Sequence, residues 1–284
     1  MKTQVKNKLF YFLSIGLLSL TFIACEKEDK DPIIETKIVE KDVKSYKATI
    51  NFIEKVNGDD VVYNTSNMPY QNKKGQDYNI SKLRFLISNV TFHKNNGTSF
   101  TIKGYHLFDN TVSESSTYEP SVKVPEGEYE SVSFTFGFNE EDNQTGLYQD
   151  LNLANWGWPG MSGGHDHGHG DMGDLGGGYH FMQLEGQYDS SGVAKGFEVH
   201  MGKAKNENEN PPLFENNHFI ARLPSSAIKV DEDFSFTLVM NIDQWFENPY
   251  EWDFNIYNMS IMGSYDAQKK LNINGPTVFT FKRE

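Results

Sequence analysis

The sequence predicts an all-β protein, a single antiparallel β-sandwich domain with long inserted loops. Three observations favour this fold: segments that alternate between apolar and polar residues recur along the chain, turn residues separate them, and helical periodicity is scarce. Nine or ten strands of ordinary length are typical of sandwiches and barrels. After residue 45 the chain has no internal repeat and no proline-rich linker, so we expect one domain.

Clean alternation identifies the first strands. In residues 45–53 every second side chain from Tyr46 to Phe52 is apolar, so one face of this strand should point into the core. Residues 81–92 and 99–109 flank an Asn-Asn-Gly sequence, which predicts a hairpin turn. Further strands are expected at residues 129–138, 178–188, 195–202, 217–224, 233–242 and 276–282.

Two long segments, 140–172 and 243–267, interrupt this series of strands. Loops of such length in a compact domain are usually functional or disordered. The first contains three of the eight histidines of the chain, and the second is rich in aromatic residues. The loops are therefore where we look first for function.

The N-terminus predicts export. Lysines precede an uncharged apolar run, Leu9–Ala24, as in a secretory signal peptide. The tetrad Phe22–Cys25 resembles a bacterial lipobox, so we expect lipidation of Cys25 and attachment to a membrane through that lipid. An ordinary cleaved signal peptide and an uncleaved anchor are the alternatives. The expected organisation is a lipoprotein signal peptide at residues 1–24, an acidic tether at 25–44 and the folded domain at 45–284.

Composition limits the kinds of ligand. Cys25 is the only cysteine, so the mature domain has no disulfide, and any metal site must do without thiolates. The formal net charge is −13, and removal of residues 1–24, which hold three lysines and no acidic residue, makes it −16. Nucleic-acid binding needs a basic face and is excluded. Cation binding fits this charge better.

A histidine-rich sequence lies in the first long loop. His165, His167 and His169 alternate with Asp and Gly, and glycine lets such a segment fold back so that several imidazoles reach one ion. Imidazole suits copper, zinc and nickel, and the Irving–Williams order favours Cu(II). Met161 and Met172 add soft ligands if the ion is Cu(I). The alternative is a mobile loop with incidental histidines.

His180 and His200 lie in predicted strands instead. A turn at residues 189–192 would pair residues whose numbers sum to 381, which puts His180 on one face with Met182, a soft Cu(I) environment. His200 would then lie on the other face, near Glu198. A regular hairpin does not bring the two histidines to one ion, and a bulge or a one-residue slip would be needed. The alternative for His180 is a histidine at the edge of the core, bonded to backbone.

Aromatic residues leave other functions open. Trp156 and Trp158 precede the histidine-rich sequence and suit a sugar platform, a lid over a metal site or plain core packing. The aromatic loop 244–252 favours a surface glycan-binding or adhesion module. No phosphate-binding loop, nucleophile elbow or zinc-protease motif is present, so we do not expect an enzyme.

The segments together resemble the MbnP-like copper-binding domain family of extracytoplasmic bacterial proteins, in its Bacteroidota-type lipoprotein branch. The likeness spans nearly all of Ser45–Phe281. The resembling segments are Leu83–Phe92, Tyr105–Asp109, Tyr129–Asn139, Trp158–Pro159, Gly176–Gly186, Gly196–Gly202, Asn217–Pro224 and Ile261–Phe281.

This resemblance implies a β-sandwich that binds copper, with zinc as the second choice, often beside a di-haem MauG-like partner that can oxidise a tryptophan. By position, Trp158 falls in the family's tryptophan-containing segment, His200 in its His-x-Gly element and His180 in the Gly-Tyr-His-Phe-Met element of this branch. The inserted residues 162–176 depart from the family pattern and leave open which ligands are inherited.

The sequence thus predicts an outer membrane lipoprotein, facing the periplasm or the exterior, that captures or stores copper. His180, His200 and Trp158 would form the inherited site, and His165, His167 and His169 an accessory one. The alternatives are a metal-free glycan-binding or adhesion module and a scaffold for a partner protein.

Overall fold

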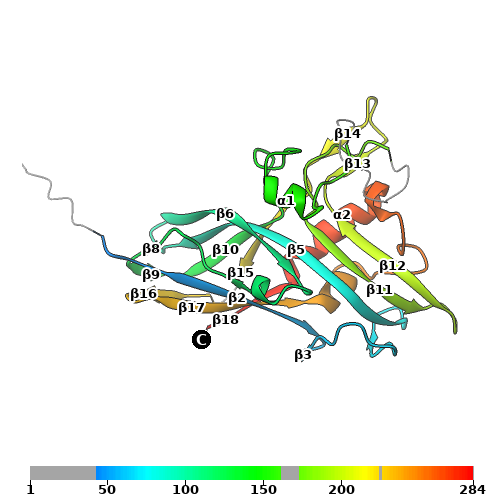
Figure 1. The fold of residues 1–284 in the computed structure, drawn as a ribbon, viewed down its shortest axis with the longest axis horizontal. Helices are drawn as coiled ribbons and strands as arrows, with labels where there is room; N and C mark the ends of the chain where they lie inside the picture. Colours follow the sequence, from blue (N-terminus) through cyan, green and yellow to red (C-terminus); the bar gives the residue numbers. More distant parts are fainter. Residues whose placement is uncertain (1–42, 161–172, 224–225, 284) are drawn as a thin grey trace, which may run out of the picture. The chain divides into compact units, whose positions relative to one another are not determined.

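Two β-sheets packed face to face form the core of the structure (Figure 1). The computed structural model describes residues 43–160, 173–223 and 226–283, and these belong to one compact unit that runs from Asp42 to the C-terminus. The predicted all-β sandwich is confirmed. Within the described residues, no helix is both long enough and apolar enough to cross a membrane.

The first sheet is built around one long strand, β5, and has the strand order β12-β11-β5-β10-β15, with β4 and β6 also paired to β5. All of its pairs are antiparallel. Its strands are β4 (Tyr70–Gln71), β5 (Asp77–His93), β6 (Ser99–Asp109), β10 (Ser131–Phe136), β11 (Met182–Asp189), β12 (Ala194–Met201) and β15 (Phe219–Leu223).

The second sheet has the order β18-β17-β2-β3, with β7 also paired to β2. One of its pairs, β2 with β17, is parallel, which departs from the expected antiparallel pairing. Its strands are β2 (Ala48–Val56), β3 (Asp59–Asp60), β7 (Thr117–Tyr118), β17 (Phe234–Asn241) and β18 (Phe279–Arg283). Three two-stranded sheets complete the strands: β1 (Ser45–Tyr46) with β8 (Val124–Pro125), β9 (Gly127–Tyr129) with β16 (Ile228–Val230), and β13 (Ala204–Asn206) with β14 (Leu213–Glu215).

Helices occupy parts of the two long segments that the sequence analysis left without structure. The α-helices are α1 (Gln149–Leu153) and α2 (Tyr265–Asn274), and the 3-10 helices are η1 (Ser113–Ser116), η2 (Ile242–Phe246), η3 (Ile261–Gly263) and η4 (Gly275–Thr277). The hydroxyl of Ser264 accepts a hydrogen bond from the amide of Ala267 and so caps the start of α2.

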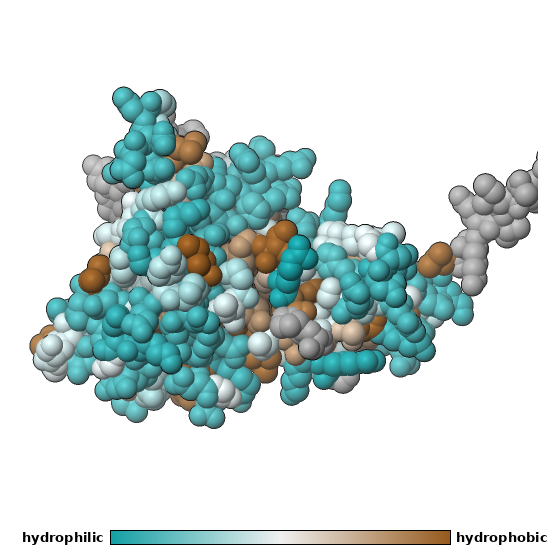
Figure 2. All heavy atoms as spheres, turned by 180° about the vertical axis from the view of Figure 1, so that it is seen from behind, coloured by the Kyte–Doolittle hydropathy of each residue, from teal (hydrophilic) through white to brown (hydrophobic). Residues whose placement is uncertain are grey.

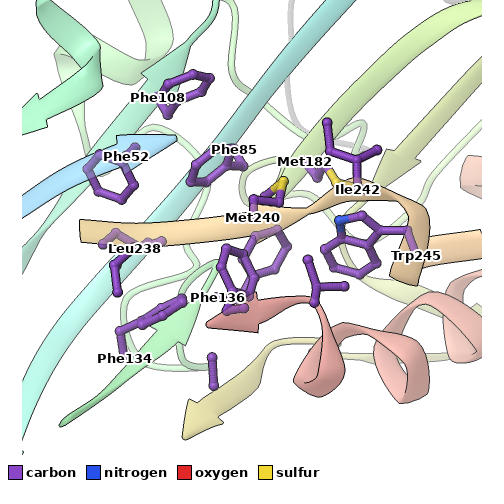
Figure 3. Close-up of a cluster of buried hydrophobic side chains, with 14 of the residues drawn as sticks. Phe52, Phe85, Phe108, Phe134, Phe136, Met182, Leu238, Met240, Ile242 and Trp245 are labelled. Carbon is purple, nitrogen blue, oxygen red and sulfur yellow. The ribbon is translucent and has the colours of Figure 1, made fainter. Parts of the chain in front are cut away.

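Aromatic side chains from both sheets fill the space between them (Figure 3). Phe85 and Phe136 come from the first sheet, and Phe52 comes from the second and meets Phe85 edge to face with 5.8 Å between ring centroids. The expected apolar face of β2 is buried, including Ala48 and Ile50. This large apolar core stabilises the domain without disulfides.

The aromatic loop belongs to the same core. Trp245 and Trp252 are both 0% exposed, and the indole of Trp252 donates a hydrogen bond to the carbonyl oxygen of Tyr257 at 3.0 Å. These two indoles therefore offer no stacking platform to a sugar. The tryptophans of this loop pack in the core instead of forming a binding surface.

The surface opposite to the view of Figure 1 is mostly hydrophilic, with apolar side chains in small groups (Figure 2). The exposed apolar residues include Leu153 at 78%. Scattered apolar residues of this kind are normal on a soluble protein.

A change of partner along β5 determines where the candidate site forms. On one edge, β5 pairs with β11 as far as Phe85 and with β10 from Ile87 onward. At the junction, the amide of Leu86 bonds to Phe181 and its carbonyl accepts from Gly137. Because β10 occupies the edge beyond this point, β11 cannot extend along it, and the chain bends away at Phe181.

Gly137 makes this junction sterically feasible. Its φ of +79° is in the left-handed region that favours glycine. A Cβ atom there would lie 2.3 Å from the ring of Phe181. The bend before β11 thus depends on the absence of a side chain at residue 137.

Candidate metal centre

The hairpin of β11 and β12 has a different register from the predicted one. Gln183 lies opposite His200, so paired residue numbers sum to 383 and not 381. The predicted register is wrong because the turn is shifted by one residue. Hydrogen bonds between Ser190 and Val193 close it, instead of the predicted closure between Asp189 and Gly192. His200 therefore shares the outer face of the sheet with Gln183 and Glu185, and it contacts Glu185 where Glu198 was expected.

His180 and His200 lie side by side despite the hairpin's alternation. Their ring centroids are 5.4 Å apart with an interplanar angle of 77°, and each residue is only 1% exposed. His180 precedes β11, beyond the bend at Phe181, so it does not follow the alternation of the strand. This bend takes the place of the bulge or one-residue slip that would otherwise be needed to bring the two histidines together. Met182 instead packs in the core, and the predicted face shared by His180 and Met182 is wrong (Figure 3).

A carboxylate orients His200. Nε2 of His200 lies 2.9 Å from Oε1 of Glu185, which also accepts a hydrogen bond from Nζ of Lys82 at 2.9 Å. Burial by itself would raise the pKa of Glu185, but the hydrogen bonds from His200 and Lys82 outweigh it and lower the pKa to about 2. The ionised carboxylate can only accept, so Nε2 of His200 donates.

A backbone carbonyl orients His180. The oxygen of Trp156 accepts from the amide of His180 at 2.9 Å and from its Nδ1 at 3.3 Å. A carbonyl oxygen has no proton to give, so Nδ1 of His180 is the donor. Each histidine thus has one nitrogen committed as a donor, which is how metal-binding imidazoles are usually held.

Two tryptophans enclose His180. The ring centroid of Trp156 is 5.4 Å from that of His180, and the centroid of Trp158 is 5.0 Å from it in an edge-on arrangement. Both indoles are buried, and Nε1 of Trp158 donates to the carbonyl of Leu175 at 3.1 Å. Trp158 also lies against Gly202, where a Cβ atom would come within 2.4 Å of the indole. His180 is therefore covered by apolar rings.

The segment that contains Trp158 is joined to the segment before His180 by backbone hydrogen bonds. The carbonyl of Pro159 accepts from the amides of Leu175 and Gly177, and Trp158 donates to Gly178. The histidine-rich sequence begins and ends at this hydrogen-bonded base. His165, His167 and His169, like Cys25, lie outside the described residues.

In the described ranges, no group of three or more His, Cys, Asp and Glu side chains is placed to hold a metal ion. The remaining described histidines are separate from the pair and bond to their own neighbours. His93 bonds to Ser133, His106 to the carbonyl of Ser115, and His218 to Asn216. His180 and His200 are thus two imidazoles in direct ring contact, which is the start of a nitrogen donor set.

The sequence analysis missed three residues that support the pair: Lys82, Arg84 and Glu185. All three lie on the outer face of the first sheet, where a charged residue would ordinarily be a solvated one. The alternation of β5 and β11 indicates their outward direction. It gives no sign that residues 154–156 cover Arg84, whose guanidinium contacts the carbonyl of Ala154 and the indole of Trp156.

Comparison with known proteins gives a family match and a structural one. The family model described as MbnP matches residues 45–263. The solved structure of MbnP from Methylosinus trichosporium superposes with a TM-score of 0.51 at 12% sequence identity, over 85% of this chain and 99% of that one. At that identity the superposition supports the fold alone. Among curated proteins, none matches the chain.

Proposed function

Because this chain belongs to the MbnP family, we propose that it binds copper and that His180 and His200 are two of the copper ligands. The observation that carries the proposal is the ring contact between two buried imidazoles whose donor nitrogens are already committed. Neutral imidazole is a good ligand for copper and zinc, so the donor set fits the ion.

The surroundings of the pair favour copper retention over transient contact. Trp156 and Trp158 pack against His180, both histidines are buried, and an apolar shell of this kind limits the access of solvent to a bound metal. Glu185 stabilises a positive charge that forms at His200, because hydrogen bonds from His200 and Lys82 lower the pKa of this carboxyl to about 2. When bound, copper would supply charge and coordination, while these residues orient the imidazoles and exclude water.

The finer parts of the function rest on the sequence. We propose that lipidation of Cys25 anchors the protein to the outer membrane, and that His165, His167 and His169 form an accessory site that delivers copper to the pair. A di-haem partner that oxidises a tryptophan would find two candidates, since Trp156 and Trp158 both contact His180. The intact mass of the natively produced protein reports lipidation and any added oxygen.

Elemental analysis tests the metal proposal. The untagged mature protein is exposed to equal copper and zinc, desalted and analysed beside His180→Ala, His200→Ala and a triple His165/His167/His169→Ala variant. His218→Ala is the matched control, since this histidine bonds to Asn216 away from the pair.

We expect the parent, the control and the triple variant to retain copper near one equivalent, and the two pair variants to lose it. Copper retained by both pair variants but lost from the triple variant would move the site to the loop. Absence of copper from the parent would reject the proposal.

A further inference from the structure

Two cations stand at alternate positions on the outer face of β5, beneath the histidine pair. They are Lys82 and Arg84, which the two-residue period of a strand places on the same side. Each forms an ion pair on the sheet: Nζ of Lys82 with Glu185 at 2.9 Å, and Nε of Arg84 with Asp109 at 2.8 Å. The side chain of Arg84 is only 12% exposed, which is unusual for an arginine.

Lys82 is connected to His200 through Glu185. Its ammonium group and Nε2 of His200 share a single carboxylate oxygen, Oε1 of Glu185. Lys82 and Glu185 are also direct partners in the pairing of β5 with β11, so their approach is fixed by the backbone. Lys82 holds the carboxylate in place, and the carboxylate sets the orientation of His200.

Arg84 is connected to His180 through a different set of contacts. Its Nη2 donates to the carbonyl of Ala154 at 3.0 Å, and its guanidinium carbon lies 4.8 Å from the ring centroid of Trp156. The backbone oxygen of Trp156 accepts both hydrogen bonds from His180. Arg84 thus contacts the segment that orients His180 in two ways, through the backbone carbonyl of Ala154 and through the indole of Trp156.

Gln183 fixes Arg84 from the side of the hairpin. Its Oε1 accepts from Nη1 of Arg84 at 3.3 Å, and Gln183 is the residue directly opposite His200. The order across four strands is therefore Asp109, Arg84, Gln183 and His200. This row of polar residues connects Arg84 with the hairpin. Lys82 reaches His200, and Arg84 reaches His180, through the separate contacts described above.

We propose that Lys82 and Arg84 are positioning residues, one for each histidine: Lys82 fixes His200 through Glu185, and Arg84 fixes His180 through Trp156. The inference rests on the proposed function for its bearing on copper, while its structural part concerns the metal-free protein. The two cations differ in what can replace them. Arg84 stacks with its planar guanidinium and bonds through several nitrogens, so lysine is not an equivalent there. Lys82 acts as a point charge on one carboxylate, so arginine can take its place.

The test uses long-range ¹⁵N–¹H NMR of the histidine rings in the full mature protein without metal. These spectra report the tautomer of each imidazole, which a general loss of stability does not change selectively. We expect Lys82→Met to alter the ring signals of His200 and leave those of His180, and Arg84→Met to do the reverse. Lys82→Arg should restore the parental spectrum. Arg84→Lys, which keeps the charge beside Asp109 and guards against misfolding of Arg84→Met, should not.

Copper affinity is the second readout. By the usual effect of residues that orient metal ligands, Lys82→Met and Arg84→Lys should each lower the affinity about 10- to 100-fold. Lys195→Met, an exposed residue of the same hairpin, is the control and should bind as the parent does. Parental ring signals and affinity in both Lys82→Met and Arg84→Lys would overturn the inference. Selective ring changes in a parent that binds no copper would instead support the positioning roles and reject the proposed function.

Discussion

The rings of His180 and His200 touch, although strict alternation along their hairpin would send them to opposite faces of the sheet. The contact arises because His180 lies beyond the bend that precedes β11. It therefore depends on residues remote from both rings. Substitutions at the bend or behind the tryptophans should change metal binding without removing a ligand.

Gly202→Ala should weaken copper binding and destabilise the fold. The new Cβ would lie 2.4 Å from the indole of Trp158, which must then move away from His180. Overpacking of this kind costs about 1–3 kcal/mol of unfolding free energy. Chemical denaturation and a competition assay for copper give the two values. Gly196→Ala, in the same hairpin, meets only the carbonyl oxygen of Gly186 at 3.9 Å and serves as the control. Equal effects of the two changes would contradict the role of Trp158.

Gly137→Ala should disturb the bend itself. Its Cβ would fall 2.3 Å from the ring of Phe181, in addition to the strain of a φ of +79°. Gly146→Ala carries nearly the same φ, +80°, in open space and so isolates the conformational cost. We expect Gly137→Ala to lose about 1–3 kcal/mol more than this control, measured by urea denaturation. We also expect His180 and His200 to lose their contact, seen as the loss of the NOE between their ring protons. An intact NOE in a folded Gly137→Ala protein would refute this.

Copper should quench the fluorescence of two of the four tryptophans. Trp156 and Trp158 contact His180, whereas Trp245 lies in the core between the sheets. Titration with Cu(II) should therefore give a strong, saturable quench in the parent and in Trp245→Phe. A double Trp156/Trp158→Phe variant should show little of it, with calorimetry to verify that copper still binds. A quench carried mainly by Trp245 would place the metal elsewhere.

Glu54 should make the stability of the fold depend on pH. Burial raises the pKa of this carboxyl to about 7, against an ordinary value of 4.5. Its protonated form is favoured by the folded state, so its contribution to stability is complete below pH 4.5 and is lost as the pH rises through 7. A shift of this size corresponds to at most about 3 kcal/mol.

Urea denaturation of metal-free protein at pH 5 and pH 8 checks this prediction. The decrease in unfolding free energy between the two pH values should be smaller in Glu54→Gln than in the parent. Glu119→Gln, which changes an exposed carboxylate, should behave as the parent does. The same decrease in all three proteins would show that Glu54 does not ionise in this range.

The strands could be predicted from the sequence because one face of each is buried. In β2 this leaves Ala48, Ile50 and Phe52 inside, and the period of two is visible directly. Helix α2 could not be predicted in the same way. Two of its four buried residues are the polar Gln268 and Asn274, which bond to backbone atoms, so its apolar stripe is too weak to recognise.

The candidate site was predictable only in its residue types. The resemblance to the family pointed to His180, His200 and Trp158, but the contact of the two histidines depends on which strand follows β11 along the edge of β5. That choice joins residues 137 and 181 at Leu86, and no local pattern encodes it. The turn of the hairpin was also misplaced by one residue at each end, since Asp, Ser and Gly favour either placement.

The hydrogen bonds that the carbonyl of Pro159 accepts from Leu175 and Gly177 also bear on how this protein can evolve. They close the chain on either side of residues 161–172, so Trp158 and His180 keep their places whatever sequence lies between. Doubling the length of a closed segment costs only about 0.6 kcal/mol. Changes in the number of residues between these hydrogen-bonded ends should therefore cost the fold little, so histidines can be added or removed there without displacing Trp158 or His180.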